Sequence, residues 1–169
     1  PRRVLREKKA HCIEGALLAA AALWIAGESP LIMNVSPKMG KGDDDHVIAL
    51  YKVNGYWGAL SKTNHATIRF RDPVYKTMRE LALSYFHEWF VNKTGEKTLR
   101  SYSDPINLDT VTIDWVHGEG DLWTIDRVLN KARHHSIAPS KNLRLLRYAD
   151  PMELKAGRFI EWSENDPRT

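Results

Sequence analysis

A chain of 169 residues is long enough for one domain with a hydrophobic core of its own. The single cysteine excludes an internal disulfide, so folding does not depend on an oxidising compartment. The net charge is +4, but the basic residues are dispersed along the chain, which does not favour binding to nucleic acid.

An apolar, alanine-rich run predicts the first helix over about residues 11–26. Gly27 and Pro30 follow this run and are the usual signals for the end of a helix. The run is shorter than the roughly 18 residues of a transmembrane helix. Basic residues precede it, but no convincing signal-peptide cleavage site follows. We therefore expect a buried core helix, no membrane association and a cytoplasmic location.

A hairpin is predicted after the first helix. Asn54-Gly55 between two apolar arms is the strongest two-residue turn signal. Both faces of the first arm are apolar, which places that arm in the middle of a sheet. The predicted elements of this region are a buried strand over 31–35, an exposed loop over 36–42, hairpin arms over 46–53 and 56–63, and an extension of the sheet over 66–70.

The second half of the chain is predicted to be mainly helical. Asp72-Pro73 supplies a helix cap followed by proline, and apolar residues then recur at helical spacing as far as Trp89. Arg69 and Arg71 alternate with apolar neighbours and are expected to form a solvated basic face. The other predictions are strands over 98–102 and 159–162, an irregular stretch over 103–114, helices over 119–134 (ending at His134-His135) and 140–148, and a frayed tail over 163–169. Together these elements predict an α+β fold with an antiparallel sheet, in a single domain.

The only cysteine, Cys12, lies at the start of the first predicted helix. Unpaired backbone N–H groups and the positive end of the helix dipole favour a thiolate there. The thiolate is the nucleophilic form of cysteine. His46, at the start of the first hairpin arm, offers a general base. The alternative is a buried cysteine that acts as a small apolar residue.

Stretches around these two residues carry a resemblance to a known family. They are His11-Cys12-Ile13-Glu14-Gly15-Ala16-Leu17-Leu18, Asp44-Asp45-His46-Val47-Ile48-Ala49-Leu50 and Tyr56-Trp57-Gly58-Ala59-Leu60-Ser61-Lys62-Thr63-Asn64-His65, with Arg69-Phe70-Arg71-Asp72-Pro73-Val74-Tyr75 and Ser84-Tyr85-Phe86 in support. They resemble the transglutaminase-like branch of the cysteine-peptidase superfamily, and more narrowly a bacterial group of that type. The recognisable part covers residues 10–102, and residues 103–169 are expected to be a helical C-terminal extension.

The resemblance implies a papain-related fold, with the cysteine-bearing helix packed on an antiparallel sheet. It also implies a Cys-His-Asp triad with Cys12 as nucleophile and His46 as general base. The family's carboxylate falls on the strand after the histidine, where this chain has Ser61 and no acid. Hairpin pairing puts Ser61 and Thr63 on the His46 face, whereas the amide oxygen of Asn64 is chemically the better acceptor for the imidazole N–H. We expect Asn64 to be the third catalytic residue, with Ser61 and Thr63 as alternatives.

The chemistry implied is acyl transfer or amide hydrolysis on a peptide or protein substrate, through a thioester on Cys12 and without a cofactor. Candidate substrate-binding residues are Trp57, Ser61 and His11, the last also a candidate oxyanion donor. Sheet packing is the alternative role for Trp57. A catalytically silent domain of the same fold, used for binding or assembly, is the alternative function, because the triad carboxylate is absent. The chain starts at Pro1, close before Cys12, and we expect it to be part of a longer protein.

The acidic run 43–46, together with His11 and His65, could also be read as a metal site. Successive side chains of an extended segment alternate, so three adjacent acids cannot all face one ion. The ligand spacing of a divalent site is also absent. We therefore expect no metal and a solvated acidic loop, in which Asp44 or Asp45 is a candidate to raise the basicity of the neighbouring histidine.

Overall fold

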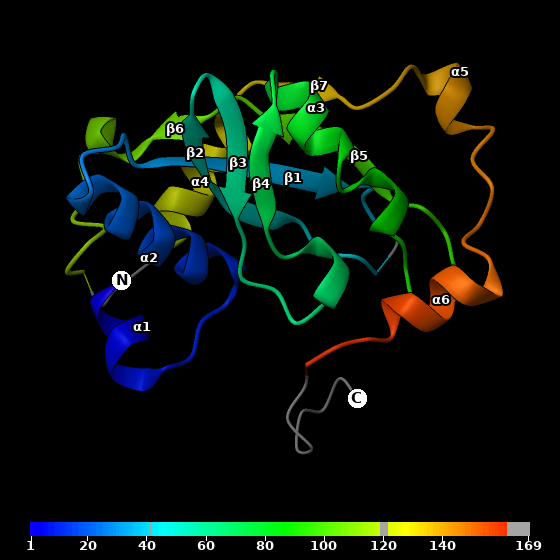
Figure 1. Cartoon of the computed structure of the whole chain (residues 1–169), viewed down its shortest axis with the longest axis horizontal. Helices are drawn as coiled ribbons and strands as arrows, with labels where there is room; N and C mark the ends of the chain where they lie inside the picture. Colours follow the sequence, from blue (N-terminus) through cyan, green and yellow to red (C-terminus); the bar gives the residue numbers. More distant parts are fainter. Residues whose placement is uncertain (41, 119–121, 162–169) are drawn as a thin grey trace.

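The computed structural model describes residues 1–40, 42–118 and 122–161. The described strands form one sheet in the order β4-β3-β2-β1-β5-β7, with β6 also paired to β1, and each of these pairings is antiparallel (Figure 1). The strands are β1 (Leu31–Pro37), β2 (His46–Val53), β3 (Tyr56–Leu60), β4 (Arg71–Tyr75), β5 (Leu99–Ser103), β6 (Ile106–Asn107) and β7 (His134–Ser136). The helices are α1 (Arg2–Glu7), α2 (Cys12–Ile25), α3 (Met78–Leu83), α4 (Trp123–Lys131), α5 (Ser140–Leu143) and α6 (Pro151–Gly157), with 3₁₀ turns η1 (Ala66–Ile68), η2 (Phe86–Glu88) and η3 (Leu108–Thr110). This arrangement confirms the α+β prediction.

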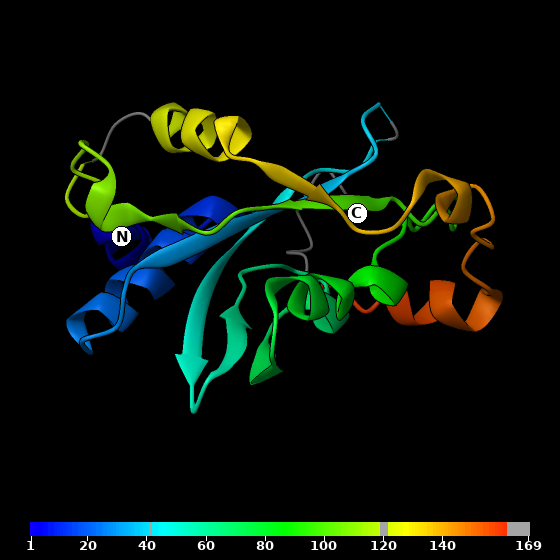
Figure 2. The same ribbon diagram turned by 90° about the horizontal axis from the view of Figure 1, so that it is seen from above.

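Apolar side chains cover both faces of the sheet. Figure 2 shows α4 on one side of the sheet and α3 on the other. Along β2, Val47 and Ala49 join the core cluster of α2 and α4, whereas Ile48 and Leu50 join the cluster of α3. This follows from the two-residue period of a strand. A strand buried on both faces lies in the interior of the sheet, as predicted for residues 46–53.

The predictions for the first half of the chain are largely confirmed. The first helix and the strand after it are present as α2 and β1. Asn54 and Gly55 both have positive φ, and Val53 pairs with Tyr56 across them. The second arm is shorter than predicted, because β3 leaves the ladder after Leu60. The N-terminal helix α1 was not predicted, and none of the helices in the described ranges is both long and apolar enough to cross a bilayer.

The helix predicted at Asp72-Pro73 is wrong. These residues lie in β4, an edge strand, where the missing N–H of a proline is tolerated. The helix begins after Thr77 instead, where Thr77 Oγ1 accepts from the Glu80 N–H and Glu80 accepts from the Thr77 N–H. The sheet extension predicted over 66–70 is also wrong, because η1 occupies this stretch and β4 follows it. Arg71 does not lie on a solvated face, since its side chain is only 13% exposed.

The C-terminal half holds more strand than predicted. His134 and His135 lie in β7, not at a helix end, because α4 ends at Lys131. The predicted helix over 140–148 is reduced to α5, and α6 was not predicted. The strand over 98–102 is confirmed by β5, while the one over 159–162 is reduced to a single bridge between Ile160 and His65. Positions 119–121, residue 162 and the predicted frayed tail lie outside the described residues.

The hydroxyl of Tyr85 lies in the core without a hydrogen-bond partner among the described residues. Its ring packs in the cluster of α3, and the Arg71 guanidinium lies 4.1 Å from the ring centroid. Tyr85→Phe keeps the ring and removes an unsatisfied polar group, so we expect it to raise the free energy of unfolding by about 1 kcal/mol in urea titrations. The exposed Tyr56→Phe is the matched control and should change nothing. A loss of stability in Tyr85→Phe would show that the hydroxyl is bonded after all.

Candidate functional site

Cys12 is the first residue of α2, directly after the N-cap residue His11. The His11 backbone N–H donates to Glu14 Oε2 at 2.8 Å, which closes the first turn of the helix. The sequence therefore starts the helix where predicted, with Glu14 serving its N-terminus. The side chain of Cys12 is half-buried.

The Cys12 thiol faces the backbone N–H of Val47, in the peptide that joins His46 to Val47. This position lies beyond the end of β3, whose last residue pairs with Ala49. Burial raises the pKa of the Cys12 thiol, and the nearby charge of Asp45 raises it further, although the Val47 N–H opposes the rise. The resting thiol is therefore protonated at neutral pH, whereas its place at a helix N-terminus predicts a thiolate.

His46 is buried at the start of β2, with only 7% of its surface exposed. It lies on the same face of the strand as Ile48, and its imidazole and the Trp89 ring meet there in a T-shaped arrangement, with centroids 6.1 Å apart. Burial lowers the pKa of His46 to about 4, and the positive charges of His65 and Lys62 act in the same direction. The imidazole is therefore neutral at pH 7.

Ser61 fixes the tautomer of this neutral imidazole. Its Oγ lies 2.5 Å from His46 Nε2 and donates its hydrogen to the carbonyl of Ile68 at 3.2 Å. Because the serine hydrogen is used there, the hydrogen shared with His46 has to come from Nε2. The lone pair is then on Nδ1, which has no hydrogen-bond partner in the described ranges. The described residues also give no hydrogen bond between Cys12 and His46.

The contact expected of Asn64 is made by Ser61. Asn64 Oδ1 accepts from Lys62 Nζ at 2.8 Å and does not contact His46. Thr63 Oγ1 accepts from the His65 N–H. The predicted hairpin pairing, which puts Ser61 on the His46 face, is confirmed. The amide of Asn64 is the better acceptor chemically, but it does not reach His46, because the chain turns away once β3 has ended.

The other predicted substrate-binding residues lie outside this site or are otherwise engaged. Trp57 pairs with Lys52, six residues along β2 from His46, which is about 20 Å at the rise of a strand. Lys52 Nζ lies 4.7 Å from the Trp57 ring centroid, so this tryptophan serves sheet packing. The backbone N–H of His11 is bonded to Glu14 and is not available to an oxyanion.

Two acids of the run before β2, Asp43 and Asp45, accept hydrogen bonds from different residues. Asp43 accepts from Trp89 Nε1 at 2.9 Å and from Thr98 Oγ1. Asp45 accepts from Asn34 Nδ2 at 3.0 Å. No cluster of three or more potential metal-binding acids, histidines or cysteines occurs in the described part of the chain. Asn34 and Trp89 were not predicted as residues of this region. The one signal for Asn34 was its position as a polar residue within an apolar strand.

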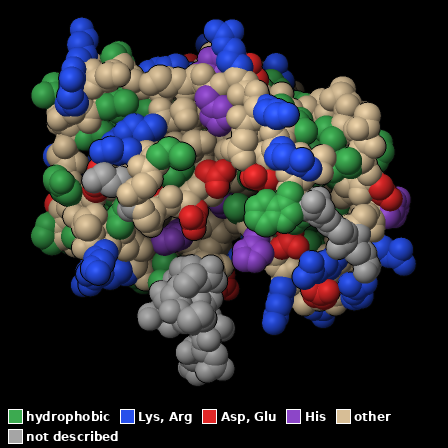
Figure 3. Space-filling view, turned by 180° about the vertical axis from the view of Figure 1, so that it is seen from behind, with side chains coloured by type: hydrophobic (Ala, Val, Ile, Leu, Met, Phe, Trp, Pro, Cys, Tyr) green, Lys and Arg blue, Asp and Glu red, His purple; other side chains and the backbone are tan. Residues whose placement is uncertain are grey.

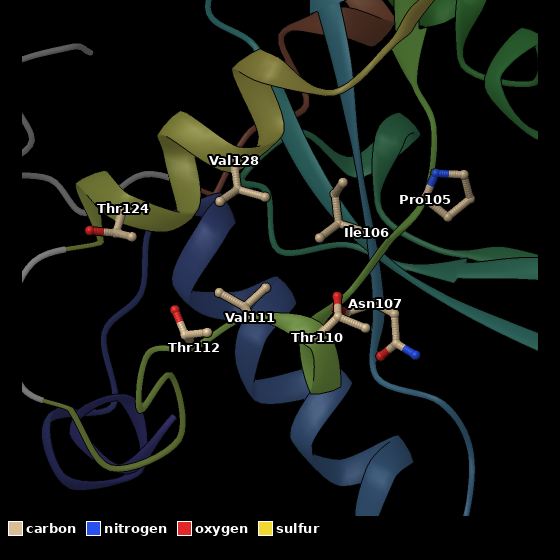
Figure 4. Close-up of a pocket in the computed structure, with 8 residues that line it drawn as sticks. All are labelled: Pro105, Ile106, Asn107, Thr110, Val111, Thr112, Thr124 and Val128. Atoms are coloured by element: carbon tan, nitrogen blue, oxygen red, sulfur yellow. The ribbon is translucent and has the colours of Figure 1, made fainter.

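Two cavities lie away from Cys12 and His46. One, of about 500 Å³, lies beside β6 and α4 (Figure 4). The other, of about 490 Å³, is lined by Arg79 and residues 136–140. On the face shown in Figure 3, acidic side chains gather near the middle and the basic ones are scattered around them. This scatter offers no continuous basic surface to a nucleic acid on that face.

No protein-family model matches this chain, and a search of curated proteins finds no match either. The chemistry therefore has to be judged from the residues themselves. They provide a protonated thiol at a helix N-terminus, at the peptide that joins His46 to Val47, and a neutral imidazole whose Nε2 is held by a serine. Transfer of the thiol proton to this imidazole would form a thiolate and an imidazolium, the charged state that nucleophilic attack requires.

Proposed function

We propose that this chain catalyses thiol-dependent acyl transfer or amide hydrolysis on a peptide or protein substrate, with a transglutaminase-like, papain-related site. The observation that carries the proposal is the place of the Cys12 thiol at the peptide between His46 and Val47. Ser61 holds Nε2 of the histidine and leaves the Nδ1 lone pair free to act as a base.

The proposed reaction begins when Nδ1 of His46 takes the thiol proton and the Cys12 sulfur attacks the amide carbonyl. The imidazolium then gives this proton to the leaving amine as the carbon–nitrogen bond breaks, which leaves a thioester. Water attacks the thioester after losing a proton to Nδ1, and the thiol is restored. The backbone N–H groups of Val47, Ile13 and Cys12 favour negative charge on the sulfur during the attack. The described residues give no hydrogen bond between the thiol and the imidazole, so the two groups have to approach each other when substrate binds.

An activated ester tests this proposal without knowledge of the natural substrate. With p-nitrophenyl acetate we expect a burst of nitrophenol as Cys12 is acylated, followed by slower steady turnover. His46→Ala should lower the steady rate about a hundredfold, because deacylation loses its base. Cys12→Ala should abolish both phases, whereas Asn64→Ala should leave them unchanged. Equal turnover in the parent chain and His46→Ala would refute the proposal.

The raised pKa of the Cys12 thiol favours a second candidate, a catalytically silent domain of the same fold used for binding or assembly. The described partner of His46 Nε2 is Ser61 and not a carboxylate, which points the same way, because Ser61 cannot stabilise an imidazolium as a carboxylate does. This candidate predicts no burst. It also predicts that iodoacetamide alkylates Cys12 only at pH values above the usual thiol range, with the same pH profile in His46→Ala.

A further inference from the structure

Asp43 is a half-buried carboxylate in the loop that precedes β2, three residues before His46. Its Oδ2 accepts from Trp89 Nε1 at 2.9 Å and from Thr98 Oγ1. Thr98 is fully buried, and its backbone N–H donates to the Trp89 carbonyl at 3.3 Å. The three hydrogen bonds close a ring of Asp43, Trp89 and Thr98, so Trp89 is held at both its side chain and its backbone.

The indole held in this ring packs against His46. Only 4% of the Trp89 surface is exposed, and its ring and the imidazole lie 6.1 Å apart with their planes at 67°. T-shaped contacts of this kind are a preferred arrangement of aromatic rings and have a defined geometry. Asp43 forms no hydrogen bond with His46 in the described part of the chain. Its influence on the imidazole therefore passes through the indole.

A general base needs the correct orientation of its ring as well as the correct tautomer. Ser61 binds His46 Nε2 and fixes the tautomer. A single hydrogen bond still leaves the imidazole able to rock about its Cβ–Cγ bond, since this torsion has a broad energy minimum. Rocking changes the direction of the Nδ1 lone pair. A large buried ring that is itself held in place, as Trp89 is, restricts this rotation.

We propose that Asp43 is a positioning residue for His46: its carboxylate holds the Trp89 indole, and the indole fixes the plane of the imidazole. The orienting work of a triad carboxylate is then divided, because Ser61 sets the tautomer and Asp43 sets the ring plane without touching the histidine. A carboxylate suits this role, because its hydrogen bonds are stronger than those between neutral groups. This inference deepens the proposed function and rests on it, since Nδ1 of His46 is the base there.

Nuclear magnetic resonance with isotope-labelled histidine tests the proposal without any substrate. In the parent chain at neutral pH we expect a protonated His46 Nε2, an unprotonated Nδ1, and a nuclear Overhauser contact between the His46 and Trp89 rings. Asp43→Ala should weaken the ring contact and move both nitrogen resonances towards the average of the two tautomers, because a rocking imidazole holds Ser61 less well. Asp43→Asn should restore the parent spectrum, since its amide oxygen can still accept from Trp89 Nε1.

Ester turnover supplies the second readout. We expect Asp43→Ala to lower the steady rate about tenfold, because the base is misdirected and not removed. Trp89→Phe, which lacks the indole N–H, should change the spectrum and the rate in the same direction. Trp115→Phe is the matched control, because Trp115 is also buried but belongs to the other core cluster, and it should behave as the parent. Urea titrations define conditions under which each variant is folded.

A His46 spectrum in folded Asp43→Ala that equals that of the parent would overturn the positioning role, even if turnover fell. A parent chain without a burst would refute the proposed function instead. The histidine spectra of the parent, Asp43→Ala and Asp43→Asn then decide by themselves whether Asp43 orients the imidazole.

Discussion

Acidification from pH 7 to pH 4.5 is expected to destabilise the parent chain by about 2.5 kcal/mol more than it destabilises His46→Gln. Burial lowers the pKa of His46 from 6.5 to about 4 in the folded protein. Between these two values the unfolded chain binds a proton that the folded chain does not. Stability therefore rises with pH in this window: the contribution is complete above pH 6.5 and is lost progressively as the pH falls towards 4.

Urea titrations of the parent chain and His46→Gln at both pH values measure this difference. Carboxylates that titrate in the same range are common to the two proteins and cancel in the comparison. The exposed His87→Gln is the control and should lose as much stability on acidification as the parent. Equal acid losses in the parent and His46→Gln would show that the imidazole is not held neutral by burial. The catalytic proposal would then need a different protonation state for its base.

Local signals in the sequence were enough for the elements that position the site. The alanine-rich run and the glycine after it specify α2, and Asn54-Gly55 specifies the hairpin of β2 and β3. The hairpin register follows from the turn alone, which is why the contact between Ser61 and His46 could be placed on one face in advance.

Near the start of α3, two local signals for a helix start compete, and the prediction followed the wrong one. Asp72-Pro73 is a common start for a helix, but proline is also tolerated on an edge strand. The stronger start lay five residues further on, where Thr77 and Glu80 have the spacing of a capping box. Which strand becomes the edge of the sheet depends on long-range pairing, and no local pattern carries that information.

The protonation of the site could not be predicted from the sequence either. A helix N-terminus favours the thiolate of Cys12, but burial and the Asp45 charge act against it, and both depend on the folded sheet. The contact between Asn34 and Asp45 likewise requires β1 to pair with β2. Sequence reasoning singled out Cys12 and His46, while their electrostatic surroundings come from strands that meet only in the fold.

Arg71→Lys is expected to lower the free energy of unfolding by about 3 kcal/mol, the largest effect of a single conservative change outside the site. The Arg71 guanidinium donates to the carbonyls of Thr67 and Ser84, both at 3.1 Å, and to Glu88 Oε2 at 2.7 Å. It also lies 4.1 Å from the centroid of the Tyr85 ring. The compact ammonium of lysine cannot reach these acceptors together, so half-buried carbonyls would lose their donor.

Arg69→Lys is the matched control, two residues earlier in the same motif. Arg69 is more exposed, with 35% of its side chain accessible, and it pairs with Glu161, whose side chain is 76% exposed. Exposed ion pairs contribute little, so we expect a loss of less than about 1 kcal/mol in urea titrations. An equally small loss of stability in Arg71→Lys and Arg69→Lys would mean that Arg71 acts only through its charge, which lysine keeps.

The effect of Arg71→Lys should also reach His46. Thr67, whose carbonyl Arg71 holds, is followed by Ile68, whose carbonyl accepts from Ser61 Oγ. If this turn loosens, Ser61 loses the acceptor that fixes the tautomer of His46, and the Nδ1 lone pair is no longer assured. We therefore expect ester turnover to fall in Arg71→Lys under conditions where the variant is still fully folded, and not to fall in Arg69→Lys. Unchanged turnover in a folded Arg71→Lys would show that Ser61 keeps its orientation without this support.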